Sequence, residues 1–475
     1  MNCIEQIYIN GKFVTPLGNE WANLYNPSTE QVIGQVRLGN KQDAQNAIAA
    51  AHAAFPAWSQ TTREERLAAL KRMHQAIIAR EDELMEAILL EYGAPAVKGR
   101  WMATYPADAI AQVIDALKSF VFEEQIGSAK VIQTPVGVAG LITPWNSNAG
   151  FICNKLATAL AAGCTALIKP SEMSALQTQV VIEALHEANL PSGVFNIVNG
   201  RGDIVGEEIA NNTQIAKISF TGSTTVGQHL LTVGATTMKR ITLELGGKSP
   251  TIVLDDADFK MIMPLILNAG FANSGQACIA GTRILVPQSR LQEFEQLAKH
   301  AVMQIKSGNP YLADTDIGPM VSEKQWQRVQ NYIRLGQEEG ATLLIGGLGK
   351  PNDLQTGWFV KPTLFTRANN QMRIAREEIF GPVLTIIPYD GDEDAITIAN
   401  DTDYGLSALI LGTDTVRCER IARKINAGRV LINSLVNEPL APFGGFKHSG
   451  LGRENGRWGI NAYLEPKAII LQENY

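Results

Sequence analysis

The sequence predicts an α/β fold built from two parallel-sheet domains, and three observations support this. From residue 136 onward, short apolar runs alternate with helix-forming segments, as in repeated strand–helix–strand units. The runs are almost continuously apolar, which is typical of strands covered by helices on both faces. The alternation resumes after residue 250 with different contents, and 475 residues suffice for two to four domains.

The elements follow in order along the chain. Residues 41–117 are rich in Ala, Leu, Glu and Lys with apolar residues about every 3.6 positions, which predicts helices. The tail at 463–472 reads as a strand and carries Pro466, so we expect it at a sheet edge. In the first α/β half we expect strands at 136–145, 165–170, 195–200, 217–222 and 241–247, and helices at 154–163, 174–190, 203–212 and 225–235. In the second half we expect strands at 282–287, 342–347, 382–390, 406–412 and 429–434, and a helix at 290–305.

Composition excludes several classes of protein. The formal net charge is −6, from 41 basic and 47 acidic residues, and no Lys/Arg block interrupts the chain. We therefore expect no nucleic-acid partner and no membrane association. No apolar run approaches the roughly 18 residues of a membrane span, and the N-terminal segment does not resemble a signal peptide. The five cysteines lack CxxC spacing and the six histidines lack HExxH, so we expect no disulfide framework, no metal site and a cytoplasmic location.

Polar residues follow the strands of the first half at the points where those strands end. They are Asn146, Lys169 with Glu172, Ser223 and Glu244. In an open parallel sheet, ligands bind outside the carboxyl ends of the strands. We therefore expect an amide, an ammonium group and two carboxylates to converge on one sheet edge.

The segment from Gly222 to Gly227 joins a predicted strand to a predicted helix. Its small residues would let the backbone approach a phosphate at the helix N-terminus. An ordinary tight turn would have the same composition. Its position within a βαβ series favours the phosphate-binding interpretation.

Glu244 breaks the pattern of an inner strand. Ile241, Leu243 and Leu245 share one face, so Glu244 must lie on the other face of the same strand. Burying a carboxylate costs several kcal/mol unless it is paired or protonated. Glu244 is therefore a candidate general base, and a structural ion pair is the alternative.

Cys278 lies in a loop of small residues at the junction of the two α/β halves. A lone cysteine is usually a small buried hydrophobic residue, and that interpretation suits Cys153, Cys164 and Cys418, which fall in or beside predicted helices. The glycine-containing loop before Cys278 indicates accessibility instead. A thiolate there would be able to form a covalent intermediate.

An ordered set of motifs resembles the aldehyde dehydrogenase superfamily, and the match runs nearly end to end. Any one motif is weak evidence, but their order is specific. The set comprises Pro144-Trp145-Asn146, Lys169-Pro170-Ser171-Glu172, Phe220-Thr221-Gly222-Ser223, Leu243-Glu244-Leu245-Gly246-Gly247-Lys248, Gly275-Gln276-Ala277-Cys278, Glu378-Ile379-Phe380-Gly381-Pro382 and Pro442-Phe443-Gly444-Gly445-Phe446-Lys447.

The resemblance implies catalytic roles. Cys278 is expected to be the nucleophile that adds to the aldehyde carbon. Asn146 and the Cys278 backbone N–H would form the oxyanion hole, where one aimed donor contributes about 3–4 kcal/mol. Glu244 would activate water for hydrolysis of the thioester, and Lys155 matches a lysine near the active site. The implied reaction is oxidation of an aldehyde to a free carboxylic acid.

The resemblance also implies a dinucleotide cofactor. A carboxylate at Glu172 would accept hydrogen bonds from the ribose and repel a 2′-phosphate, which favours NAD while NADP remains possible. Lys169 and Glu172 match positions at the adenosine ribose, Ser223 a pyrophosphate contact and Glu378 a nicotinamide-ribose contact. The cofactor positions expected in full are Thr143, Trp145, Lys169, Ser171, Glu172, Gly222, Ser223, Leu245, Glu378 and Phe380.

The substrate pocket departs from the pattern of many relatives, because Ser147 and Asn148 follow Asn146 where an aromatic residue and a proline are common. We expect it to be wider or more polar there. The other expected lining positions contain no arginine, which favours an uncharged aldehyde. The lining is expected from Ser147, Phe151, Asn154, Ala277, Ile279 and the segment 435–441.

Family architecture further implies a Rossmann-like cofactor domain, a second α/β catalytic domain and a small β flap for oligomerisation. The expected bounds are 1–116 and 136–246 for the cofactor domain, 247–447 for the catalytic domain, and 117–135 with 460–475 for the flap. A homodimer or homotetramer is implied. Three alternatives remain: acyl transfer to coenzyme A, a non-catalytic structural or binding protein, and a cysteine hydrolase surviving as a side activity.

Overall fold

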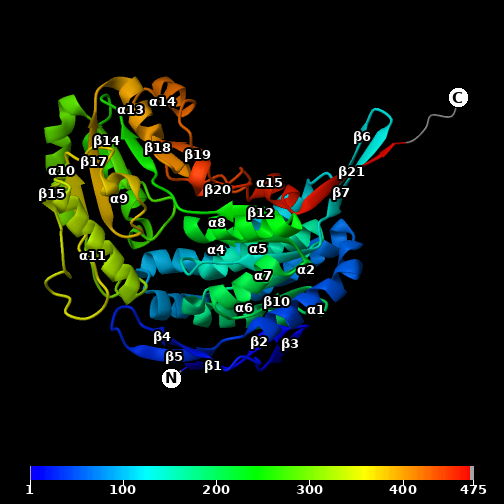
Figure 1. The fold of residues 1–475 in the computed structure, drawn as a ribbon. Coiled ribbons are helices and arrows are strands. Elements are labelled where there is room, and N and C mark those ends of the chain that lie inside the picture. The colour runs from blue at the N-terminus through cyan, green and yellow to red at the C-terminus, as the bar shows by residue number, and fades with distance from the viewer. Residues whose placement is uncertain (1, 471–475) are drawn as a thin grey trace.

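A computed structural model describes residues 2–470 and contains two large sheets and two small ones (Figure 1). The first large sheet has the order β20-β12-β11-β8-β9-β10-β2-β3. Its five central strands run parallel, and antiparallel pairing adds β20 at one edge and β2 with β3 at the other. The strands are β2 (Ile7–Ile9), β3 (Lys12–Val14), β8 (Val138–Ile142), β9 (Thr165–Lys169), β10 (Phe195–Ile197), β11 (Ile215–Thr221), β12 (Arg240–Glu244) and β20 (Gly450–Leu451).

Helices cover both faces of this sheet, as its apolar strands predict. Along β8, Val138 and Ile142 pack on one side with residues of α1, α7 and α8. Ala139 and Leu141 pack on the other side with residues of α2, α4, α5 and α6. These helices are α1 (Lys41–Ser59), α2 (Arg63–Ile78), α3 (Glu81–Ala87), α4 (Ala96–Lys118), α5 (Asn148–Ala162), α6 (Ala175–Glu187), α7 (Glu207–Asn211) and α8 (Thr224–Gly234).

Capping residues set where several of these helices begin. The Asn40 side chain accepts hydrogen bonds from two N–H groups of the first turn of α1, and Asp43 completes a capping box. Thr62 and Glu65 form the same arrangement at the start of α2. Each cap typically contributes about 1 kcal/mol.

The second large sheet has the order β15-β16-β17-β14-β13-β18-β19, with β15 as an antiparallel edge strand. Alternation along β14 again covers both faces, since Ile284 and Val286 join one apolar cluster and Leu285 joins another. The strands are β13 (Pro250–Val253), β14 (Arg283–Pro287), β15 (Thr342–Ile345), β16 (Thr363–Thr366), β17 (Val383–Tyr389), β18 (Ser407–Leu411) and β19 (Arg429–Ile432). The helices are α9 (Phe259–Phe271), α10 (Leu291–Met303), α11 (Glu323–Glu338), α12 (Arg373–Arg376), α13 (Gly391–Asn400) and α14 (Thr415–Ala422). A further helix, α15 (Gly456–Asn461), packs against α4 and α5 of the first half.

A three-stranded antiparallel sheet projects from the body of the molecule (Figure 1). It consists of β6 (Glu123–Ile126), β7 (Ala129–Pro135) and β21 (Leu464–Ile470). β21 is an edge strand and pairs Pro466 with Gln133, as the proline predicts. The predicted oligomerisation flap extends to residue 475, and residues 471–475 lie outside the described part of the chain. A second small sheet joins β1 (Asn2–Ile4), β4 (Trp21–Tyr25) and β5 (Val32–Arg37).

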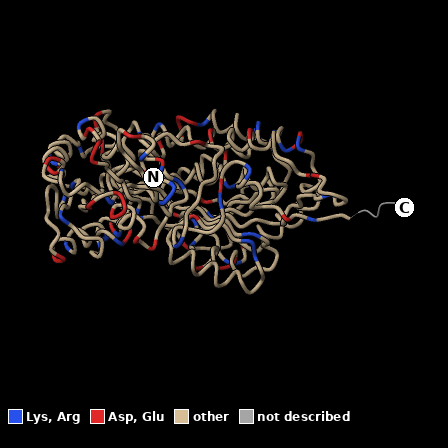
Figure 2. Tube along the Cα trace, turned by 90° about the horizontal axis from the view of Figure 1, so that it is seen from above, with Lys and Arg blue, Asp and Glu red and all other residues tan. Residues whose placement is uncertain are grey.

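The α/β class with parallel-sheet cores is confirmed, and several elements go beyond the sequence prediction. Periodicity did not predict β13, α9, α11 or the strands before residue 40, because short or mixed runs give no clear period. Basic and acidic residues are interspersed along the trace (Figure 2). Within residues 2–470, no helix has the length and apolar character needed to cross a bilayer.

Candidate active site

Cys278 lies in the loop between α9 and β14, and its position is held by unusual backbone geometry. Asn273 and Ser274 both have left-handed φ values, 55° and 59°, just before it. The Gln276 side chain accepts a 2.9 Å hydrogen bond from the Val321 N–H and reaches the Pro319 carbonyl at 3.3 Å. These contacts fix the loop against the 318–321 segment, so the thiol is held in a defined place.

The surroundings of Cys278 favour the thiol over the thiolate. Burial raises its pKa to about 12, and the carboxyls of Glu378 and Glu244 add to the effect, while Arg429 opposes it. An ordinary cysteine is already only a few per cent thiolate at neutral pH. A base or a bound positive charge must therefore activate it.

Asn146 follows β8 and lies against the cysteine loop. Its Nδ2 donates a 3.1 Å hydrogen bond to the Gln276 carbonyl, two residues before Cys278. One N–H of the amide remains available for another acceptor. The next residue, Ser147, has a left-handed φ of 65° and begins α5.

Glu244 ends β12 on the face opposite Leu243 and Leu245, and it is only 3% exposed. Neither carboxyl oxygen has a hydrogen-bond partner among the described residues. Burial raises its pKa well above the ordinary value, and the nearby Glu454 carboxylate adds to the rise. A carboxylate with a raised pKa is a stronger base once it has ionised. The surroundings of Glu244 therefore suit a general base.

Lys155 on α5 lies near enough to Glu244 to act on its charge. Its ammonium is buried, donates a 2.9 Å hydrogen bond to Ser219 Oγ and forms an ion pair with Glu454. Glu454 itself reaches the cavity that contains Cys278. Lys155 thus contacts the site through Glu454 and does not line the cavity itself.

A cavity of about 610 Å³ brings most of the predicted residues together. It lies between the two large sheets and is rimmed by α4, α5, the cysteine loop and β19. The predicted lining residues found there are Asn146, Ser147, Phe151, Asn154, Glu244, Ala277, Cys278 and Ile279, with Leu435 and Asn437 from the 435–441 segment.

One expectation about this cavity needs correction. The positions chosen from the sequence contained no arginine, but Arg429 of β19 lines the cavity, and so does Lys98 of α4. Strand periodicity predicted a strand at 429–434 but did not show which residue faces the cysteine loop, because the partner surface comes from distant segments. Leu440, at the other end of the 435–441 segment, borders a different cavity.

The positions expected to hold a cofactor follow adjacent strands of the first sheet. β9 ends at Lys169, whose Nζ lies 3.1 Å from Glu172 Oε2. Ser171 caps the short helix at Glu172, and Ser223 caps α8 after β11. Since β11, β8 and β9 are neighbours in the sheet, these groups share one edge. Thr143 is buried and hydrogen-bonded to Asn148, a Cβ on Gly222 would clash with the Phe220 ring, and Leu245 packs in the core against α8.

Glu378 joins this edge from the second half of the molecule. Its Oε1 accepts a 2.9 Å hydrogen bond from the Gly247 N–H, and burial raises its pKa to about 7. Phe380, with a left-handed φ of 61°, places its ring edge-on to Trp145 with centroids 5.4 Å apart. The two halves therefore meet at the expected cofactor positions.

Gly247 is a site residue that the sequence motif contained but did not explain. A Cβ there would lie 2.3 Å from the Cys278 carbonyl oxygen. The segment between β12 and β13 thus approaches the cysteine loop so closely that only glycine fits. The Gly-Gly pair after Glu244 was the available signal, but it gives no hint of which segment it contacts.

Comparison with known proteins gives the family. The model of the aldehyde dehydrogenase family matches residues 13–469. A 3-succinoylsemialdehyde-pyridine dehydrogenase from a Pseudomonas species is 43% identical over 472 residues, covering 99% of each chain. Aldehyde dehydrogenase C of Pseudomonas syringae, solved as a cysteine-to-alanine variant with NAD+ and octanal, is 44% identical with a TM-score of 0.97, covering 98% of this chain and 96% of that one. An aldehyde dehydrogenase of Mycobacterium tuberculosis complexed with NAD+ is 37% identical with a TM-score of 0.97, covering 100% and 99%. The chain belongs to the aldehyde dehydrogenase family.

Proposed function

We propose that this enzyme oxidises an uncharged aldehyde to the free carboxylic acid with NAD, through a covalent intermediate on Cys278. The observation that carries the proposal is the pairing of groups in one cavity. A thiol and an unpartnered, buried carboxyl group, Cys278 and Glu244, line the same 610 Å³ space. A nucleophile and a base so arranged can form and then hydrolyse a thioester.

Acylation begins when the Cys278 thiolate adds to the aldehyde carbon. The carbonyl oxygen becomes an alkoxide in the tetrahedral thiohemiacetal, and its charge needs donors aimed at it. The free N–H of Asn146 Nδ2 and the Cys278 backbone N–H are assigned to this role. The Asn146 contact with the Gln276 carbonyl orients the amide before substrate arrives.

Hydrolysis returns the enzyme to its starting state. Glu244 takes a proton from water as the water oxygen attacks the thioester carbonyl, and the Cys278 sulfur leaves. Glu244 is buried, so its carboxylate is a strong base once it ionises. The proton then resides on the Glu244 carboxyl group, and the nearby Glu454 carboxylate favours this protonated form.

The residues at the sheet edge fit a dinucleotide. Glu378 keeps Oε2 free to accept from ribose hydroxyls, and a Cβ on Gly246 would come within 2.5 Å of that oxygen. Glu172 is 37% exposed beside Lys169 and can accept from a second ribose. When bound, NAD+ accepts the hydride that leaves the thiohemiacetal carbon. The solved relatives named above were complexed with NAD+. A higher kcat/KM with NADP than with NAD would contradict the assigned role of Glu172.

The choice of an uncharged aldehyde is supported by apolar walls. Phe151, Leu431 and Leu435 line the cavity beside the cysteine. The Pseudomonas syringae relative was solved with octanal.

Because all five cysteines are free thiols, we assign the enzyme to a reducing compartment such as the cytoplasm.

The test is NADH absorbance when purified protein is mixed with NAD and a panel of neutral aliphatic and aromatic aldehydes, without coenzyme A. We expect NADH formation to depend on Cys278 and to be lost in Cys278→Ala. Cys3→Ala, at an exposed cysteine of β1, is the matched control. If NADH forms only when coenzyme A is added, the acyl group is transferred to coenzyme A and not to water. If the protein cleaves esters and shows no NAD-dependent activity, it is a hydrolase and not a dehydrogenase.

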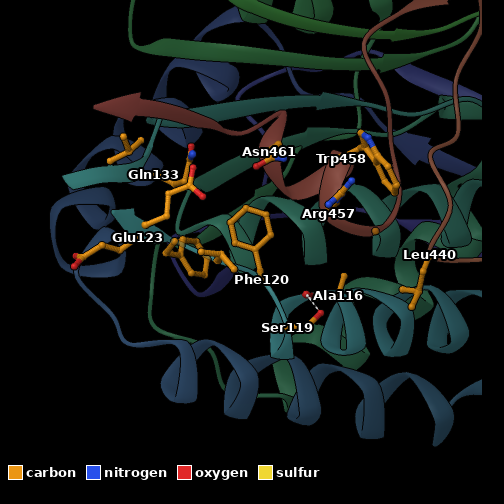
Figure 3. Close-up of a pocket in the computed structure, with 14 residues that line it drawn as sticks. Ala116, Ser119, Phe120, Glu123, Gln133, Leu440, Arg457, Trp458 and Asn461 are labelled. Carbon is orange, nitrogen blue, oxygen red and sulfur yellow. Dashed lines mark hydrogen bonds between the residues drawn. The ribbon is translucent and has the colours of Figure 1, made fainter. Parts of the chain in front are cut away.

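We also propose that the enzyme assembles as a homodimer or homotetramer through the projecting β sheet. β6 is exposed along its whole length, and Ile126, Ile469 and Ile470 are 57%, 40% and 75% exposed. A cavity of about 680 Å³ lies beside this sheet. Phe120 and Trp458 are among its lining residues (Figure 3). Light scattering that gives the mass of a single chain would contradict this assignment.

A further inference from the structure

The cavity that contains Cys278 also contains a guanidinium group without an acidic partner. Arg429 begins β19, and its Nε donates a 3.0 Å hydrogen bond to Ser407 Oγ. One Nη1 hydrogen bond of 3.0 Å goes to Asn437 Oδ1. Both acceptors are neutral, and among residues 2–470 no carboxylate forms an ion pair with Arg429. A guanidinium has five N–H donors, so three remain unused by these contacts.

The other charges in the cavity do not balance Arg429. Glu454 is already paired with Lys155. Burial and the Glu454 carboxylate raise the pKa of Glu244 well above its ordinary value, which disfavours a negative charge there. Lys98, on the opposite rim, lies 3.5 Å from the Trp101 ring centroid and has no acidic partner within the described residues. Among the described residues, the cavity therefore holds two cationic side chains without acidic partners, and Arg429 keeps unused N–H donors.

An unpaired charge in a partly desolvated cavity is costly, and burial lowers the pKa of Arg429 accordingly. An oxygen acceptor placed against the free N–H groups would offset that cost. A guanidinium presents its donors in a planar fork, which matches a carbonyl or carboxylate oxygen better than an alkyl chain. Since Arg429 and Cys278 line one cavity, a single small molecule can contact both.

We propose that Arg429 binds an oxygen acceptor carried on the chain of the aldehyde substrate and thereby selects oxo-aldehydes over simple alkanals. Arg429 is thus a specificity-determining residue. This inference rests on the proposed dehydrogenase function and narrows its substrate class. A ketone oxygen is compatible with an uncharged substrate, and a carboxylate would make the same contact.

A purely structural role is the competing explanation. Arg429 would then hold the 435–441 segment in place through Asn437, and its loss would affect all aldehydes alike. The variant Asn437→Ala removes that contact and keeps the guanidinium. It is therefore the matched control for the loop, and Arg423→Met, at an exposed arginine after α14, is the control for charge elsewhere.

The experiment compares kcat/KM for hexanal, 5-oxohexanal and 6-oxohexanoate, which have equal chain lengths. We expect the wild type to favour one or both oxygenated aldehydes over hexanal by about tenfold or more, as a charged hydrogen bond allows. In Arg429→Met this ratio should fall toward one, while Asn437→Ala and Arg423→Met keep it. An unchanged ratio in Arg429→Met overturns the proposal, and so does an equal fall in Asn437→Ala. Preference for 6-oxohexanoate alone retains the role of Arg429 but contradicts an uncharged substrate.

A second measurement does not require turnover. Alkylation of Cys278 by iodoacetamide is followed by mass spectrometry with 2-hexanone, hexanoate or no ligand. Protection in the wild type that is lost in Arg429→Met supports the contact even if no aldehyde is oxidised, which separates this inference from the proposed function. Equal protection in both proteins, or none in either, overturns it.

Discussion

Replacing Gly247 by alanine is expected to displace the nucleophile without disturbing the chemistry of any side chain. The backbone at Gly247 does not need a left-handed conformation, so alanine adds only a methyl group. That methyl carbon would lie 2.3 Å from the Cys278 carbonyl oxygen, where ordinary contacts begin at 3.4 Å. The two segments must therefore separate by about 1.1 Å, the difference between these two distances.

A displacement of this size is large for catalysis. Misplacing reacting groups by about 1 Å costs on the order of 10²-fold in rate. The same shift also disturbs the 2.9 Å hydrogen bond that the Gly247 N–H donates to Glu378. Both the position of Cys278 and that of the expected cofactor contact are therefore changed. We expect kcat/KM for hexanal to fall by about 10²-fold, with a smaller loss of stability.

The assay is steady-state NADH formation, with thermal unfolding measured on the same preparations. Gly202→Ala is the matched control, because a Cβ at Gly202 meets nothing within 4 Å. A Gly247→Ala enzyme that is folded and keeps kcat/KM within about threefold of wild type would refute the close approach and the reasoning built on it.

Three further predictions concern the cavity. Glu244→Gln removes the base but not the nucleophile, so rapid mixing should show a burst of about one NADH per active site followed by slow turnover; full steady-state activity would exclude Glu244 as the base. Because the pKa of Glu244 is raised, hydrolysis should increase with pH as the group ionises. Glu454→Gln removes a negative charge and leaves the Lys155 cation unpaired, and both changes favour the ionised form of Glu244. The rising limb of the pH–kcat profile should therefore move to lower pH. A move to higher pH would contradict the cause assigned to the raised pKa. Asn146→Ala should lower kcat by about 10²–10³-fold if its amide binds the oxyanion, and an unchanged rate would remove that role.

The catalytic centre was predictable where one segment carries the information. Glu244 stands out because the alternation of Ile241, Leu243 and Leu245 leaves it alone on the other face, and the structure buries it there without a partner. The accessibility of Cys278 followed from its small-residue loop, and Cys153, Cys164 and Cys418 are buried as expected. For these residues, the exposure that the local sequence pattern predicts is the exposure found in the structure.

The substrate pocket was less predictable, because its walls come from segments far apart in the chain. Arg429 belongs to a strand whose pattern does not reveal what it faces, and its partners Ser407 and Asn437 lie 22 and 8 residues away. Lys98 approaches from α4, more than 150 residues before the nucleophile. The absence of arginine among the expected positions therefore said little about the charge of the cavity.

The sequence by itself determined the two parallel-sheet halves and the polar residues at the strand ends, and it gave Cys278 and Glu244 as the candidates for nucleophile and base. The sheet halves follow from periodicity, and Glu244 stands out because a buried strand tolerates a charged residue only for a reason. The role of Cys278 is implied by the resemblance to the family motifs. Only the tertiary structure decided which groups share the cavity, that Lys155 contacts it through Glu454, and that Arg429 enters it unpaired. The physical reason is that charge balance and close contact, such as Gly247 against Cys278, depend on distances between elements, and a linear pattern contains no such distances.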